Sequence, residues 1–250
     1  MEVFDLGIVW NRQEDSEFIA DLNDYALKKG LRPYIMHAYN FYGSLKGFTE
    51  GYISFRYFFD RTSDDVPAFK GLADFLKRKK IIFINHADRV KRSHDKSLMH
   101  TDFIGHNIPY LSQEKIIPLN LKNRPAWFKV FYCLGEVIPS WWNPVTHMYD
   151  ILTPAEIDKF KLSDLLPLMK QIAYSVRLDF FTSEIVLNEK HSFYVVDYVN
   201  DQPDMRKKSK FDKGVPDEVV EKIVEDIVLF VKQRTMWKPK RWPIEFLMQK

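Results

Sequence analysis

Two apolar strands in the last third of the chain carry carboxylates and an amide. Residues 177–203 read RLDFFTSEIVLNEKHSFYVVDYVNDQP. Asp179 stands at the first strand, and Asp197 and Asn200 stand toward the end of the second. Mg²⁺ binds oxygen ligands from one or two carboxylates together with the phosphates of a nucleotide. The segment therefore predicts a magnesium site on an antiparallel strand pair.

Arg177 adds a positive charge beside this predicted site. It precedes Asp179 by two residues, so both side chains would lie on one face of a strand. A guanidinium there could neutralise a phosphoryl group during its transfer. One strand face would then present both charges to one ligand.

The same segment resembles the metal-binding end of ATP-grasp ligases, in the D-alanine ligase and glutamate ligase branches. In that family an Arg-x-Asp strand precedes a Glu-x-Asn-x-x-Pro strand end, and the Asp, Glu and Asn hold Mg²⁺. The resemblance implies that Asp179, Asp197 and Asn200 are metal ligands. It also implies that Arg177 is a catalytic residue and contacts the nucleotide phosphates.

The spacing of the second strand departs from the family pattern. Asp197 stands three residues before Asn200, and residues three apart in a regular strand point to opposite faces. Either a β-bulge turns one of them, or Asp201 takes the place of Asp197. We favour the bulge.

Two earlier segments are similar to the same family. The first segment has the motifs of the family's leading domain in the same order. They are Asn85 after an apolar strand, an Asp-Lys pair ending at Lys96, and the sequence GHNIP at 105–109. The resemblance implies that Lys96 reaches the nucleotide phosphates. Residues 128–137 resemble its strand-Gly-strand hairpin, in which a basic residue at the position of Lys129 faces the phosphates.

One part of the family pattern is missing. ATP-grasp ligases insert a small subdomain with a glycine-rich flap between the Ile-Pro signature and the Lys129 strand, whereas this chain has about twenty residues there. Residues 113–117 could be a remnant of the strand that meets adenine. Backbone N–H groups that cradle phosphates have no visible source in 109–129.

These features support alternative functions. The resemblance implies Mg²⁺ and ATP as cofactors. It also implies that the protein is an ATP-dependent carboxylate–amine ligase, which forms a peptide bond through an acyl phosphate. Its partners would be ATP and a small carboxylate or an amino acid. The alternative is a degenerate ATP-grasp protein that binds a nucleotide or a partner without catalysis. A phosphotransferase is a third interpretation.

The first half of the chain alternates apolar runs with helical spacing, which is typical of an α/β domain with a mostly parallel sheet. Strands are predicted at 3–9, 34–38, 52–59 and 81–84, and helices at 15–29, 67–80 and 93–106, the last capped by Ser93. In the second half we expect strands at 128–134 and 136–142 joined at Gly135, a helical region at 154–174 interrupted at Pro167, an antiparallel pair at 177–187 and 193–199, and a helix at 219–231.

The predicted fold class is therefore α/β and ATP-grasp-like. Residues 1–110 would form an N-terminal parallel α/β domain. Residues 111–250 would form a C-terminal α+β domain with an antiparallel sheet. This second domain would be a shortened Mg²⁺- and nucleotide-binding domain.

Composition limits the remaining function classes. With 46% hydrophobic and 28% charged residues the chain resembles an ordinary globular protein. A net charge of +3 gives no strong field toward nucleic acid or membrane, so neither is expected as a partner. Cys133 is the only cysteine, and no run approaches roughly 18 apolar residues. We expect a cytoplasmic protein. The oligomeric state stays open, a homodimer included.

Overall fold

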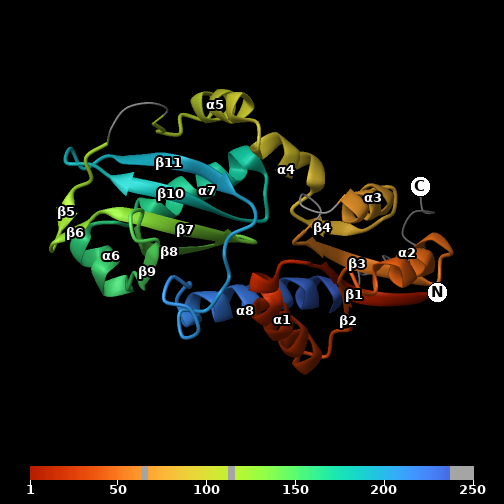
Figure 1. Ribbon diagram of the computed structural model, residues 1–250. Helices are drawn as coiled ribbons and strands as arrows, with labels where there is room; N and C mark the ends of the chain where they lie inside the picture. Colours follow the sequence, from red (N-terminus) through yellow and green to blue (C-terminus); the bar gives the residue numbers. More distant parts are fainter. Residues whose placement is uncertain (63–66, 112–115, 237–250) are drawn as a thin grey trace, which may run out of the picture.

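The computed structural model describes residues 1–62, 67–111 and 116–236 and contains two main sheets (Figure 1). The four-stranded sheet has the order β2-β1-β3-β4, and all its pairs are parallel. Its strands are β1 (Glu2–Val9), β2 (Pro33–Met36), β3 (Ile53–Asp60) and β4 (Ile82–Ile84). The predicted parallel α/β arrangement of the first part is confirmed.

Three helices accompany this sheet: α1 (Ser16–Lys28), α2 (Phe41–Thr49) and α3 (Pro67–Leu76). The sequence did not predict α2, because Gly43 and Gly47 both lower helix propensity. Gly47 packs closely against β3: a Cβ there would lie 2.6 Å from the Cδ1 atom of Ile53, so that end of the Ile53 side chain would have to shift. Tertiary packing thus outweighs local propensity in this helix.

The helix predicted at 93–106 is present as α5 (Lys96–Gly105), and a separate helix that the sequence did not predict, α4 (Ala87–Ser93), precedes it. Ser93 ends α4, and its hydroxyl donates to the carbonyl of Val90. Asp95 caps α5, because its Oδ1 atom accepts from the N–H groups of Ser97 and Leu98 at 3.0 and 3.1 Å. The prediction of a cap at Ser93 was therefore wrong.

The five-stranded sheet has the order β11-β10-β7-β8-β9, and its pairs are antiparallel. Its strands are β7 (Trp127–Cys133), β8 (Glu136–Asn143), β9 (Met148–Ile151), β10 (Phe180–Leu187) and β11 (Phe193–Asn200). Leu134 and Gly135 join β7 to β8 with φ values of 52° and 112°, as a two-residue hairpin turn requires. The hairpin predicted at Gly135 is confirmed. Two short strands, β5 (Asn120–Leu121) and β6 (Arg124–Pro125), pair with each other just before β7.

Two helices, α6 (Pro154–Phe160) and α7 (Leu165–Val176), supply apolar side chains to one core with β7 and β10. Phe128 and Ile185 of the strands share this core with Met169 and Ile172 of α7. The break between the helices is at Lys161, which is left-handed with φ 56°, and not at Pro167 as predicted. A proline in the first turn of a helix removes no helical hydrogen bond.

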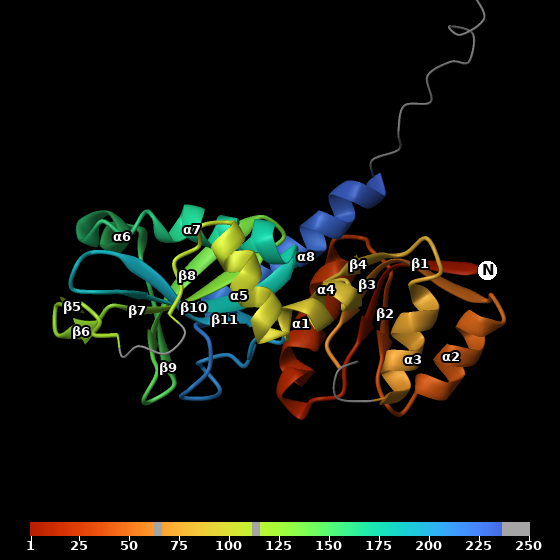
Figure 2. The ribbon, with the colours of Figure 1, turned by 90° about the horizontal axis from the view of Figure 1, so that it is seen from above.

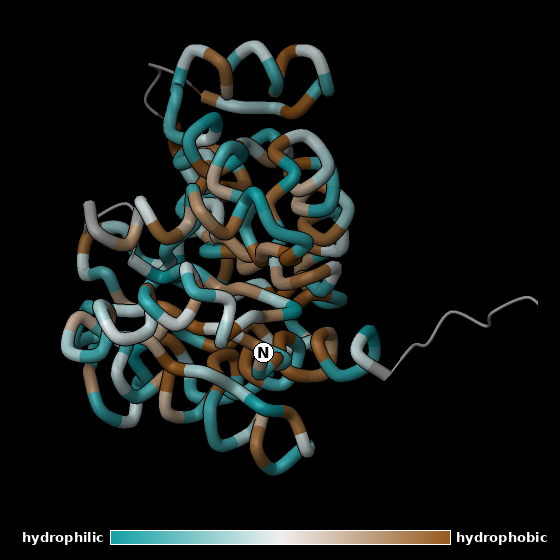
Figure 3. The backbone as a smooth tube through the Cα atoms, turned by 90° about the vertical axis from the view of Figure 1, so that its right-hand side faces the viewer, coloured by the Kyte–Doolittle hydropathy of each residue, from teal (hydrophilic) through white to brown (hydrophobic). Residues whose placement is uncertain are grey.

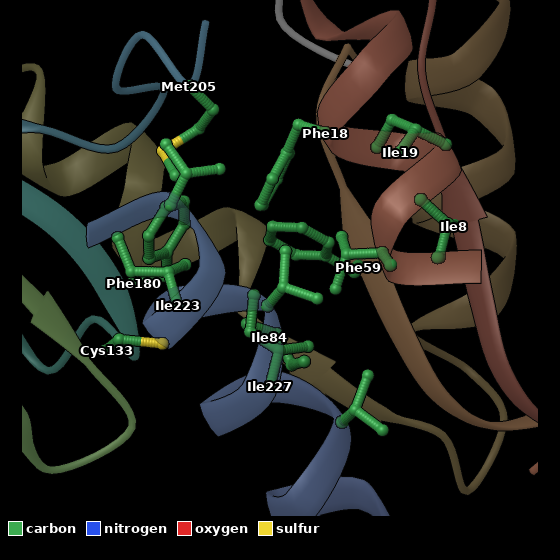
Figure 4. Packing of buried hydrophobic residues seen from close by; sticks show 14 of the residues in the cluster. Ile8, Phe18, Ile19, Phe59, Ile84, Cys133, Phe180, Met205, Ile223 and Ile227 are labelled. Atoms are coloured by element: carbon green, nitrogen blue, oxygen red, sulfur yellow. The ribbon is translucent and has the colours of Figure 1, made fainter. Parts of the chain in front are cut away.

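The last helix, α8 (Asp217–Met236), packs against elements of both sheets, including α1, β1 and β7. Figure 2 shows the two sheets side by side, with α8 between them. Ile223 and Ile227 of α8 share a buried cluster with Ile8 and Phe59 from the parallel sheet and Phe180 from the antiparallel sheet (Figure 4). The division at residues 110 and 111 stays a prediction, since α8 joins the two parts.

Hydrophobic and hydrophilic residues alternate along the chain trace in Figure 3. Within the ranges that the structure describes, no helix combines the length and the apolar content needed to cross a membrane.

The shared core predicts that both sheets depend on α8. Ile227 is 0% exposed, so Ile227→Ala should lower the free energy of unfolding by about 2–5 kcal/mol, measured by urea denaturation. Ile104→Ala is the matched control: Ile104 is 63% exposed, and its loss should stay within about 0.5 kcal/mol. Equal effects of the two substitutions would contradict the packing described for α8.

Candidate functional site

A buried ion pair crosses the middle of the antiparallel sheet. Lys129 of β7 is the register partner of Glu184 of β10, and the Nζ atom of Lys129 lies 2.8 Å from Oε1 of Glu184. The indole N–H of Trp127 donates to the other carboxylate oxygen at 3.3 Å. The two charged side chains are only 9% and 16% exposed. Because both charges lose hydration, such a pair adds little net stability, while removing one partner leaves a buried charge.

The neighbouring strand β11 carries the predicted bulge. The register pairs Thr182 with Asn200 but Glu184 with Asp197, so β11 has one more residue than β10 in this interval. Thr182 and Glu184 are two residues apart and share a face of β10. The bulge thus places Asp197 opposite Glu184 and Asn200 opposite Thr182, on one face of β10. The bulge favoured from the sequence is confirmed.

This arrangement places three oxygen-bearing side chains together. Asp197 is directly opposite Glu184, and Asn200 is diagonal to it, which corresponds to Cβ separations of about 5 and 7–8 Å. No group of three His, Cys, Asp or Glu side chains within the described ranges could hold a metal ion by itself. Two carboxylates and an amide do suit Mg²⁺, which completes its coordination with water and phosphate oxygens.

Asp201 was the alternative ligand, and its role as a ligand stays a prediction. It is 4% exposed, and its Oδ1 atom lies 2.8 Å from Nε2 of His94, the residue after α4. Its carboxylate therefore forms part of a contact between β11 and the α4–α5 junction.

Two hydroxyl groups near the ion pair lack partners. The hydroxyls of Ser140, the register partner of Lys129, and of Thr182 are buried and form no hydrogen bond. An unsatisfied buried donor costs about 1–3 kcal/mol. Both residues are 0% exposed, so a ligand could reach them only after neighbouring side chains move.

Asp179 does not join this group. It immediately precedes β10, five residues from Glu184, which corresponds to about 16 Å along an extended strand. Two ligands of one Mg²⁺ ion each lie about 2.1 Å from it, so Asp179 and Asp197 cannot share an ion. Burial raises the pKa of Asp179, and a hydrogen bond from the backbone N–H of Asn85 and the nearby charges of Arg89 and Arg234 partly offset this rise. The predicted ligand set Asp179, Asp197 and Asn200 does not converge in this structure.

Arg177 is not in a strand. It ends α7 in the left-handed conformation, with φ 56° and ψ 33°, and its carbonyl accepts a hydrogen bond from Arg89 at 3.0 Å. The prediction of a strand starting at Arg177 was wrong, and the argument that it shares a strand face with Asp179 fails with it. Its catalytic role stays a prediction.

Lys96 and Asp197 do lie together. Both line a pocket of about 300 Å³ between α5 and β11, with Ser97, His100, Leu111, Val196 and Tyr198. Two backbone N–H groups at the start of α5 already donate to Asp95. The ammonium group of Lys96 is therefore a stronger anion-binding group there than these N–H groups. Its contact with phosphate stays a prediction.

Sequence reasoning missed Glu184. The signal was the one charged residue in the strand-like run from Phe180 to Leu187. The Arg-x-Asp pattern drew attention to Asp179 instead, because sequence spacing alone does not show which residue faces Lys129.

The burial of Asp179 predicts a pH-dependent effect. Its pKa is raised in the folded state, so the folded protein holds this proton more tightly and the ionised carboxylate disfavours folding at neutral pH. Asp179→Asn should therefore raise the free energy of unfolding at pH 7, and the gain should vanish below the ordinary pKa of aspartate. Urea denaturation at several pH values measures it. A loss of stability at pH 7 would contradict this account.

Comparison with known proteins agrees with the architecture. No protein-family model matches the sequence, and no curated protein matches it. The structure is similar to that of the macrocyclase MdnB from Microcystis aeruginosa MRC, with a TM-score of 0.61 and 12% identity over 91% of this chain and 99% of that one.

Two further structures are similar. One is a Chryseobacterium gregarium RiPP-associated ATP-grasp ligase in complex with ADP and a leader and core peptide, with a TM-score of 0.60 and 7% identity over 94% of this chain and 97% of that one. The other is the D-alanine–D-alanine ligase from Bacillus anthracis complexed with ATP, with a TM-score of 0.54 and 8% identity over 92% and 97%. At these identities the likeness is one of fold, and the chain has the ATP-grasp fold.

Proposed function

We propose that this protein is an ATP-dependent carboxylate–amine ligase that forms a peptide bond through an acyl phosphate. The observation that carries the proposal is the Lys129–Glu184 pair with Asp197 opposite it on one sheet face. The ATP-grasp fold supports it, because ligases of that fold appear among the similar structures with ADP or ATP bound.

Each residue near the pair has a proposed role. Glu184, Asp197 and Asn200 would hold Mg²⁺, which supplies neutralisation of the charge on the nucleotide phosphates. Lys129 would leave Glu184 and bind a phosphate oxygen, because an ammonium group is a flexible point charge. Lys96 would contact phosphate from α5. The donor set and the unsatisfied hydroxyls beside it suit a ligand rich in oxygen atoms.

The proposed reaction has two steps. A carboxylate oxygen of the substrate attacks the γ-phosphorus of ATP, and the bond to ADP breaks to give an acyl phosphate. The amine nitrogen then attacks the acyl carbon, the C–O bond to phosphate breaks, and an amide forms with loss of a proton. Lys129 would balance negative charge in the first step, where electrostatic stabilisation contributes most. The proposed carboxylate is a small acid, an amino acid or a peptide side chain.

A specific observation also favours the alternative, a degenerate protein that binds a nucleotide or partner without catalysis. Glu184 already neutralises Lys129, and Ser140 and Thr182 are closed from solvent. No glycine-rich stretch exists at 109–129 of the sequence. Residues 113–115 of the proposed adenine-contacting remnant lie outside the described residues.

Ligand binding gives the first test of this proposal. Mg·ATP at a concentration about 100 times its Kd should stabilise the folded state by about 2.7 kcal/mol, and the melting temperature should rise. Glu184→Gln should abolish this rise, whereas Asp179→Asn should retain it. A rise that is lost in Asp179→Asn and kept in Glu184→Gln would contradict the assignment of Glu184.

A control separates binding from folding. Glu184→Gln leaves Lys129 buried without its partner, which could cost about 3–5 kcal/mol. The double variant Lys129→Met with Glu184→Gln removes both charges and should recover part of this loss. It should still show no response to Mg·ATP.

Catalysis is tested separately by ADP release. A panel of amino acids, small carboxylates and peptides with an amine acceptor should include a substrate that releases ADP, and hydroxylamine should trap its acyl phosphate as a hydroxamate. Lys129→Met should lower the rate by about 10²–10³-fold. Nucleotide binding with no ADP release across the panel would favour the non-catalytic alternative.

A further inference from the structure

A second pocket lies at the junction of the two sheets, away from the Lys129–Glu184 pair. It has a volume of about 320 Å³. Strand β4, the turn between β7 and β8, the residue before β10 and the last turns of α8 all contribute to its wall. Its lining includes Asp179, Arg89, Arg234, Ile82, Leu134 and Phe230. The pocket thus combines one carboxylate, two guanidinium groups and the imidazole of His86 with apolar walls.

The opposite charges in this pocket lie near each other without forming an ion pair. The carboxylate of Asp179 accepts a hydrogen bond from the backbone N–H of Asn85 and lies in the field of Arg89, Arg234 and His86, and most of the side chain is removed from solvent. Arg234 contacts Phe230, with its guanidinium carbon 3.8 Å from the ring centroid, and pairs with no described carboxylate. Arg89 uses one N–H group for the carbonyl of Arg177. Donors and an acceptor therefore remain open to one ligand.

The charges restrict the ligand class. A simple anion would bind the two guanidinium groups but would be repelled by Asp179, and a simple cation would meet the reverse problem. An ammonium group and a carboxylate on the same carbon can satisfy both kinds of group. The apolar walls suit an apolar side chain, and Ile82 is 51% exposed there, so a ligand would remove apolar surface from water.

We propose that this pocket binds a free α-amino acid with an apolar side chain, its ammonium on Asp179 and its carboxylate on Arg89 and Arg234. The site is separate from the proposed nucleotide site and does not depend on it. Because its wall joins β4 to α8 and to the β7–β8 turn, the ligand would also hold the two sheets in one arrangement.

Calorimetry on the full chain without nucleotide tests the proposal. L-leucine is the probe, up to about 10 mM, where even a site with a Kd of ~1 mM is filled. The two matched analogues are 3-methylbutylamine, which lacks the carboxylate, and 4-methylpentanoate, which lacks the ammonium group. L-leucine should bind, and each analogue should bind at least about 10-fold more weakly, because each leaves one charged group of the pocket unpaired.

Substitutions assign the two contacts. Asp179→Asn should weaken L-leucine binding at least about 10-fold and abolish the preference over 4-methylpentanoate. Arg234→Gln, on the exposed end of α8 where folding is not at risk, should weaken L-leucine binding and abolish the preference over 3-methylbutylamine. Glu184→Gln should leave L-leucine binding unchanged. Absence of binding by L-leucine, L-methionine and L-phenylalanine, or equal binding of L-leucine and both analogues, would overturn the proposal.

Discussion

The junction between the two sheets is the constraint on which the rest of the molecule depends. Helix α8 comes from the end of the chain but supplies the buried side chains that both sheets share. Asn85, directly after β4, adds a polar connection: its Oδ1 atom accepts from the backbone N–H groups of Asp179 and Phe180 at 2.8 Å each. Asn85 is 5% exposed and left-handed, with φ 61°. The start of β10 is therefore fixed against the parallel sheet, and this sets where every later residue of the strand lies.

This fixed start separates two regions of β10. At its beginning, Asp179 faces the junction pocket, where its carboxylate accepts a hydrogen bond from the backbone of Asn85 and has two arginines nearby. Five residues later, Glu184 pairs with Lys129 on the antiparallel sheet. Separating this pair without a replacement partner would leave a buried charge uncompensated. In the proposed function, Mg·ATP would bring a cation for Glu184 and anions for Lys129.

The sequence predicted those features that depend on local pattern. The Gly135 hairpin follows from its turn residues, and the bulge before Asn200 follows from the spacing of Asp197 and Asn200 on one strand. Features set by tertiary contact were missed. Helix α2 forms in spite of its two glycines, and its Phe41 and Phe48 are buried in a core shared with the parallel sheet. Helix α7 extends to Val176, so Arg177 caps this helix and does not begin a strand. Glu184 contacts Lys129 because the register of β7 and β10 places the two residues opposite each other. The spacing of residues along the chain does not show this register.

The position of the metal ion tests the central claim most directly. Crystals grown with Mn²⁺ in place of Mg²⁺ and with a non-hydrolysable ATP analogue would locate the ion by its anomalous scattering. The account predicts one or more peaks in contact with the side-chain oxygens of Glu184 and Asp197, with Lys129 moved from Glu184 to a phosphate. A peak bound to Asp179 instead, with the Lys129–Glu184 pair intact, would contradict it.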